Sequence, residues 1–598
     1  MSSVLASAHG TQAMASAASA PLPAQAPVQK NLMGLLVLAA EPSPAKAAAP
    51  APARQLCRDH TNTALSAQAV DPAQLARLRT QLGNATPNQR IVSQLPAELL
   101  TAESVQKALS PFLGRPINQE LTQGIVDAMV ALTAGQNRFL ADVYFSGQAN
   151  QQVRDGILVL IVQPATVGRV IAQGQQHTSA QELECRISLP TGSWVDLKQL
   201  ESDIQTLNYN SRWRATSLRP QLRPGDQPGS TDIVLSTQDE KPVRYTVGMD
   251  NTGNRTSALD RVRAGVSLGH VDGRFDHQLD YNFAASPDLQ KFRSHSVAYG
   301  MPIPSGDRLT LRADYISTDI MLAGNAFHFK GDNTILSAEW SRLMSAQAAQ
   351  GSFKSGEVYG GAEVKRIGSA LAFGQTAVNN NTVQVAQFFG GWRNDWRHTV
   401  GNGQTDLRGT WSPGNLLGLN DDASYDAVRT GAKAQYWRVN ASLGQNFELP
   451  KSVAPRWQIS TRLTAQMANA PLIASERMGL SGSQGVRGYY QDTLFSDAGV
   501  VGTLELQSPR WTVPVKAVND MEMQFIAFAD AGHSRNATVA TNTDLNTTSR
   551  IANISSQGVG IRLTKQRHFS VRADAARRNS GLSNDKTWFW HLSAQAAF

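Results

Sequence analysis

Apolar and polar residues alternate along the chain from Val243 to Phe598. The segment RWQISTRLTAQM, residues 456–467, sets Trp457, Ile459 and Leu463 on one face, with polar side chains between them. Residues 308–317, 435–443, 568–576 and 587–598 repeat the pattern. A period of two residues is typical of β-strands, because successive side chains of a strand point to opposite faces. The sequence therefore predicts an all-β region over residues 243–598.

A transmembrane barrel explains these strands better than a soluble sandwich does. A strand of about twelve residues is about 40 Å long and still crosses a bilayer when tilted by about 40°. Sandwich strands usually have about five or six residues. The polar faces are rich in arginine, which a water-filled lumen solvates and a sandwich core does not. We expect a transmembrane antiparallel β-barrel with an even number of strands.

The chain before residue 243 has mixed helical and strand patterns. Residues 71–83 predict a lone amphipathic helix, with Asp71 as N-cap and Pro72 at the first helical position, followed by a polar linker over 84–90. Residues 91–174 then predict the order β-α-α-β-β, and residues 175–242 a second unit with one helix and two strands. We expect two small α+β modules.

The first 53 residues have the composition of a leader. Residues 1–29 are rich in Ala, Ser and Pro, and Lys30 precedes an apolar run from Leu32 to Ala40 and the small residues at 45–47. That order is typical of a secretory signal. The alternative is a low-complexity tail.

Composition excludes several classes of protein. The hydrophobic content is 41%, without an apolar run of the about 18 residues that a membrane-spanning helix needs. The net charge is +8, but the basic residues are dispersed, so no nucleic-acid partner is expected. The two cysteines, Cys57 and Cys185, have no CxxC spacing, which argues against a zinc site. Whether they pair stays open.

Enzyme motifs are missing from the sequence. It contains no GxSxG, HExxH or CxxC motif and no Walker-type glycine loop. The eleven histidines are dispersed, and we interpret His568 and His591 as lumen or interface residues rather than ligands. We predict no catalytic residue, metal or cofactor.

One loop, SGSQGVRGYY at residues 481–490, combines three glycines with a single cation, Arg487. Together with FADAG at 528–532, GMDNTGN at 248–254, YGMPIPSGDRL at 299–309 and LRPGDQPGSTDIVL at 222–235, it carries a resemblance. The chain from 71 to 598 resembles the two-partner secretion transporters of the haemolysin and filamentous-haemagglutinin secretion type, within the outer-membrane barrel assembly superfamily.

The resemblance implies an architecture: a 16-stranded barrel, two periplasmic POTRA domains (91–174 and 175–242) and a plug helix at 71–83. It also implies that the VRGY loop folds back into the lumen, where Arg487 meets an acidic residue of the barrel wall. Asp530 is that residue here, since its strand position faces inward with Ile526 and Phe528. The alternative is a hydrated loop cation. The expected loop-to-barrel lock consists of Val486, Arg487, Gly488, Tyr489, Phe528, Asp530 and Gly532.

The function implied is transport without chemistry. We expect an outer-membrane transporter that takes a large unfolded exoprotein (an adhesin, a cytolysin or a contact-dependent toxin) from the periplasm to the cell surface by type V secretion. The POTRA modules would bind it by β-augmentation, at the edge strand in 139–147 with Phe139, Ala141, Val143 and Phe145. The barrel assembly machinery would be a partner during biogenesis. A passive porin would not need two soluble modules, so the main alternative is an insertase of the same superfamily.

Overall fold

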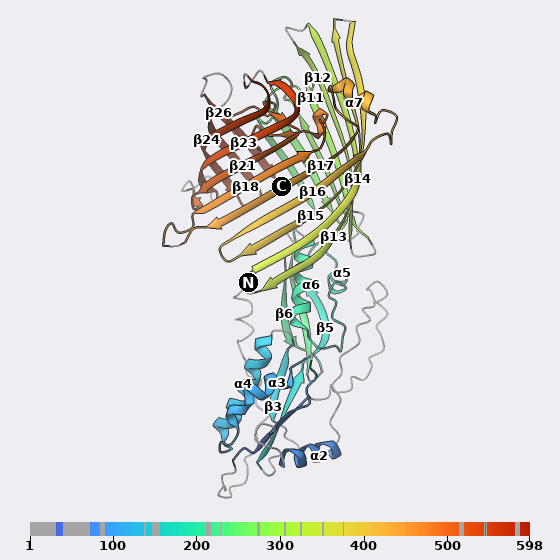
Figure 1. The fold of residues 1–598 in the computed structure, drawn as a ribbon. Coiled ribbons are helices and arrows are strands. Elements are labelled where there is room, and N and C mark those ends of the chain that lie inside the picture. Colours follow the sequence, from blue (N-terminus) through green and yellow to red (C-terminus); the bar gives the residue numbers. More distant parts are fainter. Residues whose placement is uncertain are drawn as a thin grey trace. The chain divides into compact units, whose positions relative to one another are not determined.

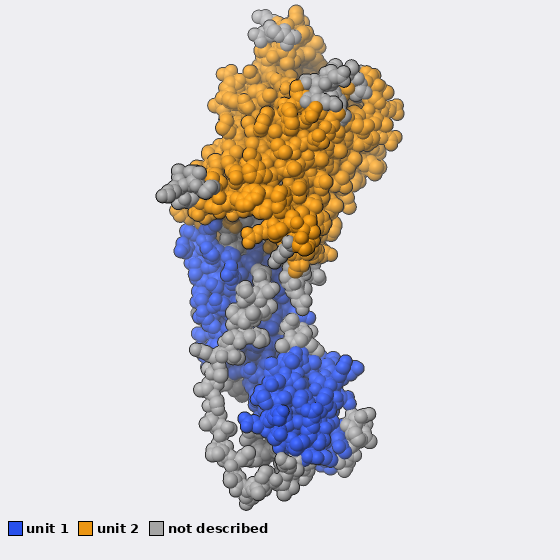
Figure 2. All heavy atoms as spheres, turned by 90° about the vertical axis from the view of Figure 1, so that its left-hand side faces the viewer, with its two compact units in different colours: residues 1–240 blue, residues 241–598 orange. Residues whose placement is uncertain are grey.

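A computed structural model describes the chain in two compact units, residues 1–240 and 241–598, which Figure 2 colours separately. The described residues are 31–39, 72–83, 90–97, 99–136, 139–145, 156–210, 217–227, 229–271, 276–303, 307–322, 326–349, 352–374, 376–450, 452–513, 520–542, 545, 547–579 and 587–598. Most of the predicted leader, Asp71, Cys57 and residues 84–89 of the predicted linker lie outside them. No helix among the described residues is long and apolar enough to cross a membrane.

The second unit is a closed antiparallel barrel of sixteen strands, which confirms the predicted fold class (Figure 1). Its strands are β8 (Val243–Asp250), β9 (Arg261–Gly269), β10 (Gln278–Ala285), β11 (Phe292–Pro302), β12 (Arg308–Leu322), β13 (Phe327–Ala349), β14 (Ser352–Phe373), β15 (Thr376–His398), β16 (Gly401–Pro413), β17 (Gln435–Glu448), β18 (Gln458–Ala468), β21 (Ala498–Gln507), β23 (Glu522–Asn542), β24 (Thr547–Lys565), β25 (Phe569–Arg578) and β26 (Trp588–Ala597). Strand β26 pairs with β8 and closes the barrel.

Strands β18, β21 and β23 show the alternation seen in the sequence. On β23, Ile526 and Phe528 are buried while Phe525 is 44% exposed. Leu463 on β18 and Leu504 on β21 also face outward, with exposures of 46% and 53%. An apolar outer surface suits lipid, and the polar inner positions suit a solvated lumen.

The first unit begins with a four-stranded sheet in the order β2–β1–β4–β3. Its strands are β1 (Gly34–Ala39), β2 (Ile91–Ser93), β3 (Ala141–Phe145) and β4 (Ile157–Pro164). Strand β1 is fully buried and pairs in parallel with β2 on one edge and β4 on the other. The prediction that the run from Leu32 to Ala40 belongs to a leader is therefore wrong for residues 32–39. A short apolar run reads the same way in a signal core and in a buried parallel strand.

Helices cover both faces of this sheet. Helices α3 (Ala102–Leu109) and α4 (Gln119–Gln136), joined through a short 3-10 turn, η3 (Ser110–Phe112), pack on one face. Thr101 caps α3, since its hydroxyl accepts the N–H of Ser104 at 3.3 Å. On the other face lies α2 (Pro72–Gly83), whose Leu78 and Leu82 contact Leu36, Leu38, Ile157 and Val159. The structure thus contradicts the plug-helix prediction, because the apolar stripe of this helix completes the sheet's core.

The second module is a three-stranded sheet in the order β5–β7–β6. It contains β5 (Thr166–Gln173), α5 (Ala180–Glu184), α6 (Leu197–Asn210), β6 (Ser217–Pro224) and β7 (Ser230–Gln238). Because β5 pairs with β7 in parallel, it belongs to this module, and the expected boundary at residue 174 lies too late in the chain. Cys185, directly after α5, is disulfide-bonded.

Candidate functional site

The segment 469–497 between β18 and β21 forms a hairpin-like finger whose inner residues are buried. At its base, β19 (Met478–Gly479) pairs with β20 (Phe495–Ser496). Leu480 N–H then donates to Leu494 O at 2.9 Å, and Val486 N–H reverses the chain by donating to Leu480 O at 2.8 Å. These backbone bonds give the loop a defined shape and hold Arg487 at its tip.

Two glycines of the finger are required by geometry. A Cβ at Gly485 would lie 2.3 Å from Leu480 O, so the turn leaves no room for a side chain. Gly488 has a φ of +91°, in the left-handed region that other residues rarely adopt. Its N–H donates to His591 Nε2 of β26 at 2.9 Å. The glycine spacing thus allows a tight turn and brings the backbone against the barrel wall.

The tip of the finger is an ion pair between Arg487 and Asp530. Arg487 Nε donates to Asp530 Oδ2 at 2.7 Å and Nη2 donates to Oδ1 at 2.8 Å. The backbone N–H of Arg487 adds a third bond to Oδ2 at 3.1 Å. The guanidinium also lies 3.4 Å from the Phe528 ring centroid, a cation–π contact. The structure therefore brings together the residues that the sequence paired.

Arg487 has further acidic neighbours that the sequence analysis missed. Its Nη1 donates to Glu505 Oε1 of β21 at 2.7 Å and lies 3.5 Å from Asp574 Oδ2 of β25. Asp574 in turn pairs with Arg572, at 2.7 Å, and with Arg562. The sequence does indicate that both acids point into the lumen, because each occupies an inward position of a strand with alternating apolar and polar residues. Many polar residues of this barrel occupy inward positions, so the alternation alone does not identify Glu505 and Asp574 as partners of Arg487.

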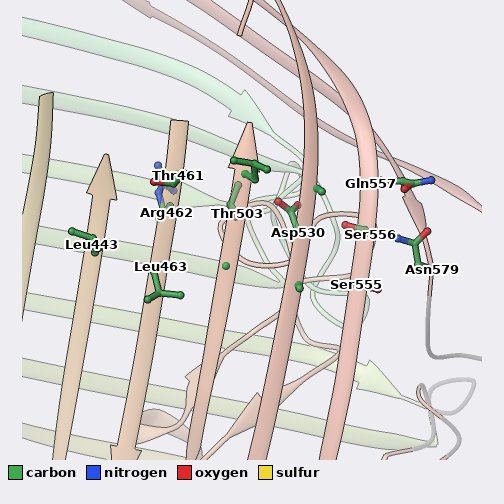
Figure 3. Close-up of a pocket in the computed structure, with 14 residues that line it drawn as sticks. Leu443, Thr461, Arg462, Leu463, Thr503, Asp530, Ser555, Ser556, Gln557 and Asn579 are labelled. Carbon is green, nitrogen blue, oxygen red and sulfur yellow. The ribbon is translucent and has the colours of Figure 1, made fainter. Parts of the chain in front are cut away.

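Figure 3 shows how the wall presents Asp530. The carboxylate lies on β23 between Thr503 of β21 and Ser556 of β24, its direct partners in the two ladders. A pocket of about 550 Å³ lies along this part of the wall, lined in part by Leu463 and Leu504. Those two leucines face outward, so this pocket does not define the luminal site.

Apolar packing surrounds the ion pair. Val486 and Tyr489 are fully buried in a cluster with Leu480, Leu494 and Ile554. The Tyr489 hydroxyl donates to Ser555 O at 3.1 Å. A Cβ at Gly532 would come within 3.0 Å of Val486 Cγ2, so the wall needs a small residue there. Every residue of the predicted lock therefore contributes to one continuous contact between finger and wall.

The two stems of the finger are held by separate charges. In the first stem, Glu476 is fully buried and pairs with Lys365 of β14 at 2.7 Å and Arg438 of β17 at 3.0 Å. In the second stem, Asp497 Oδ2 accepts a hydrogen bond from Arg429 Nη2 at 2.8 Å. Arg429 follows helix α7 (Asp422–Val428), which lies in the loop between β16 and β17.

The predicted docking strand in the first module is at a sheet edge. Among the described residues, β3 pairs only with β4. Ala165 N–H donates to Leu140 O. Hydrogen-bonded pairs alternate along an antiparallel ladder, so residues 140, 142 and 144 direct their N–H and C=O groups toward β4. The N–H groups of Ala141, Val143 and Phe145 therefore point to the free edge, while their side chains pack toward the helices.

Phe139 does not share that position. It is 7% exposed, packs edge-on against Trp194 of the second module with ring centroids 5.5 Å apart, and forms a bridge with Asp196. The outward side chain Tyr144 donates its hydroxyl to Gln163 at 3.0 Å. Partial burial, with Asp142 nearby, raises the pKa of Tyr144 above its ordinary value. The usable edge thus consists of residues 141–145.

A family model described as "Haemolysin secretion/activation protein ShlB/FhaC/HecB" matches residues 229–563. The outer membrane transporter CdiB of Dickeya dadantii is 22% identical over 419 residues, covering 67% of this chain and 69% of that protein. CdiB of Escherichia coli is 23% identical over 234 residues, so the match spans 37% of that transporter's length. The heme/hemopexin transporter protein HuxB of Haemophilus influenzae is 23% identical over 356 residues, covering 58% of this chain and 60% of that protein.

Two solved structures share the fold. CdiB from Escherichia coli aligns with a TM-score of 0.64 and 17% identity, covering 88% of this chain and 97% of that one. CdiB from Acinetobacter baumannii aligns with a TM-score of 0.55 and 15% identity, covering 96% and 91%.

Proposed function

Since the chain belongs to the haemolysin secretion/activation family ShlB/FhaC/HecB, we propose that it moves one large, unfolded exoprotein from the periplasm to the cell surface. The barrel lies in the outer membrane, and its two N-terminal modules are POTRA-like. The contact that carries the proposal is the buried Arg487–Asp530 pair, which fastens a loop inside the lumen. A lumen closed by a detachable loop suits a conduit that opens for a substrate.

Capture of the exoprotein begins at the edge of β3. The N–H groups of Ala141, Val143 and Phe145 point to an edge that no other described strand pairs, so they offer main-chain hydrogen bonds to an extended segment, with little demand on its sequence. The exposed Tyr144 lies on the opposite face of the strand from the helices. An unfolded chain supplies the missing strand, and its side chains need only fit the two faces.

Passage through the barrel then requires the finger to move, since its buried residues lie against β23, β24 and β26. No step of this process forms or breaks a covalent bond, so the proposal contains no catalytic residue. Folding of the exoprotein outside the cell would bias movement outward, because a folded domain cannot return through the barrel. The barrel assembly machinery would insert the transporter itself.

Co-expression with a large secreted protein whose reading frame neighbours that of this chain tests the proposal. In cells that lack both proteins, the pair should release the exoprotein, and each protein alone should not. The amounts of the cell's other outer-membrane barrels serve as the second readout. Loss of those barrels without any effect on exoprotein release would instead assign the chain to the insertases of the same superfamily.

A further inference from the structure

Strands β8 and β26 pair with each other and close the barrel. Their common ladder is shorter than the ladder of β8 with β9 and that of β26 with β25. It contains five residue pairs, from Ser593–Asp250 to Ala597–Thr246. By comparison, β8 and β9 form eight pairs, and β25 and β26 form nine. Main-chain bonds between Tyr245 and Phe598, at 3.1 and 2.9 Å, extend the seam past its last ladder pair at the other end of β26.

Beyond the last pair, one side chain takes over the role of the backbone. Asn251 Nδ2 donates to Trp590 O at 2.7 Å, and Leu592 N–H donates to Asn251 Oδ1 at 2.8 Å. The Asn251 N–H adds a bond to Leu592 O at 3.1 Å. The end of the seam where the chain passes into the loop 251–260 therefore depends on an exposed amide.

The finger contacts β26 at residues 589 and 591, next to the residues that Asn251 binds. Gly488 N–H donates to His591 of β26. Tyr490 packs edge-on against Phe589 of the same strand, with ring centroids 4.9 Å apart. Both contacts involve inward positions of β26, so the finger lies directly against that strand.

The same part of the finger contacts the β8 side through Arg255, in the loop that follows β8. The Arg255 guanidinium lies 4.9 Å from the Tyr490 ring centroid, and its Nε lies 3.4 Å from Asp492 Oδ1. Tyr490 is thus held between a cation from one side of the seam and an aromatic ring from the other. Cation–π and edge-on aromatic contacts both contribute beyond simple burial.

We propose that the finger acts as a staple across the barrel seam, with Arg255 and Tyr490 as its positioning residues. When Arg487 is seated on Asp530, Tyr490 bridges the loop after β8 and strand β26. When the finger leaves, the seam keeps its five ladder pairs, the Tyr245–Phe598 bonds and the Asn251 bonds but loses this bridge. Movement of the finger and opening of the seam are therefore coupled. The inference concerns barrel closure and stands whether or not an exoprotein crosses the lumen.

Hydrogen exchange of the whole protein in lipid nanodiscs tests the coupling. Peptides covering 243–251 and 588–598 report the seam, and peptides of β12 and β13 report a distant ladder. Arg255→Ala, Tyr490→Ala and Arg487→Ala should each accelerate exchange at the seam about tenfold, with the distant ladder unchanged. Tyr490→Phe keeps the ring and should retain the protection.

Arg366→Ala is the matched control, because Arg366 pairs with Asp332 across β14 and β13, on the opposite face of β14 from Lys365, the residue that binds the finger. Seam exchange in this variant should equal that of the unaltered protein. The proposal is overturned if Arg255→Ala and Tyr490→Ala leave seam exchange unchanged. Faster exchange in all ladders alike would also overturn it, since that indicates loss of barrel stability rather than a local bridge.

Discussion

Arg487 is 2% exposed although it carries a full charge, and three carboxylates surround it. The three acids are not equivalent. Asp530 receives two side-chain bonds and one backbone bond from Arg487, whereas Glu505 receives one. Removing the arginine leaves Asp530 and Glu505 without their cation, while Asp574 keeps Arg562 and Arg572. Removing Asp530 leaves the arginine with Glu505 and Asp574.

This asymmetry gives the first prediction. Arg487→Ala should destabilise the seated finger by about 3–5 kcal/mol, the cost of breaking a buried pair, and Asp530→Ala by distinctly less. Both variants should assemble, because the barrel ladder is complete without the finger. Protease sensitivity of residues 480–494 in outer-membrane vesicles measures the effect, with Arg510→Ala as control for an exposed pair. Equal sensitivity of the two variants would show that Glu505 and Asp574 do not compensate.

Asp239 in the second module gives the second prediction. Its carboxylate accepts the N–H groups of Gln176, His177 and Thr178 at 2.7, 2.9 and 2.8 Å. Burial alone would raise the pKa of Asp239, but these bonds outweigh it and hold the pKa below the ordinary value. Because the folded pKa is depressed, the stabilisation is present above about pH 4 and is lost as the pH falls through the folded pKa.

Asp239→Asn should therefore cost about 1–2 kcal/mol at pH 7, as the loss of a charged acceptor does. Hydrogen exchange of the peptide 172–180, corrected for the intrinsic effect of pH, measures the change. The difference between the variant and the unaltered protein should shrink below about pH 4. A difference that persists at pH 2 would mean that the carboxylate charge is not what stabilises the turn.

At the scale of elements, helix α2 gives the third prediction. Its Leu82 is 3% exposed and lies against the sheet. Leu82→Ala should destabilise the first module by about 2–3 kcal/mol, the cost of removing a buried leucine side chain. Faster hydrogen exchange in β1 and β4 would report it, with the exposed Arg77→Ala as control. Ion conductance in planar bilayers should not change; an increase with the module intact would restore the plug interpretation.

Strand β3 gives the fourth prediction. Val143→Pro removes an N–H that points to the free edge, so the ladder with β4 should survive while strand addition is lost. The affinity of the protein for the N-terminal domain of its exoprotein should fall at least tenfold. Asp142→Ala leaves the edge N–H groups in place and serves as control. Unaltered affinity in a folded Val143→Pro variant would move the docking site away from β3.

The elements differ in how far the sequence could predict them. The period-two alternation predicts the barrel because each strand has one face toward lipid and one toward water. The same alternation predicts that Asp530 points inward. Strand β1 was misread because six apolar residues fit both a signal core and a strand buried on both faces. Helix α2 was assigned to the lumen through resemblance alone, whereas its leucine stripe fits any apolar surface. Glu505 and Glu476 could not be singled out, because only the folded wall brings them to the finger.

At the scale of the whole barrel, the finger joins distant parts of the wall. Its first stem is bound through Glu476 to β14 and β17, and its tip through Arg487 to β21, β23 and β25. The finger is therefore attached to the barrel wall by two buried charge clusters, one at its first stem and one at its tip, and not by its tip alone. Either end can hold the loop inside when the other is released.

The final prediction follows from these two attachments. Glu476→Gln removes the charge that Lys365 and Arg438 share, so the stem loosens while the tip stays seated. Arg487→Ala does the reverse. Each variant should raise ion conductance in planar bilayers modestly, and the double variant should raise it by more than the sum, because only then are the first stem and the tip both released, with the second stem still held by Arg429 and Asp497. Arg510→Ala should leave the current unchanged. If Arg487→Ala alone gives the full increase, the stem does not restrain the finger and the tip is its sole attachment.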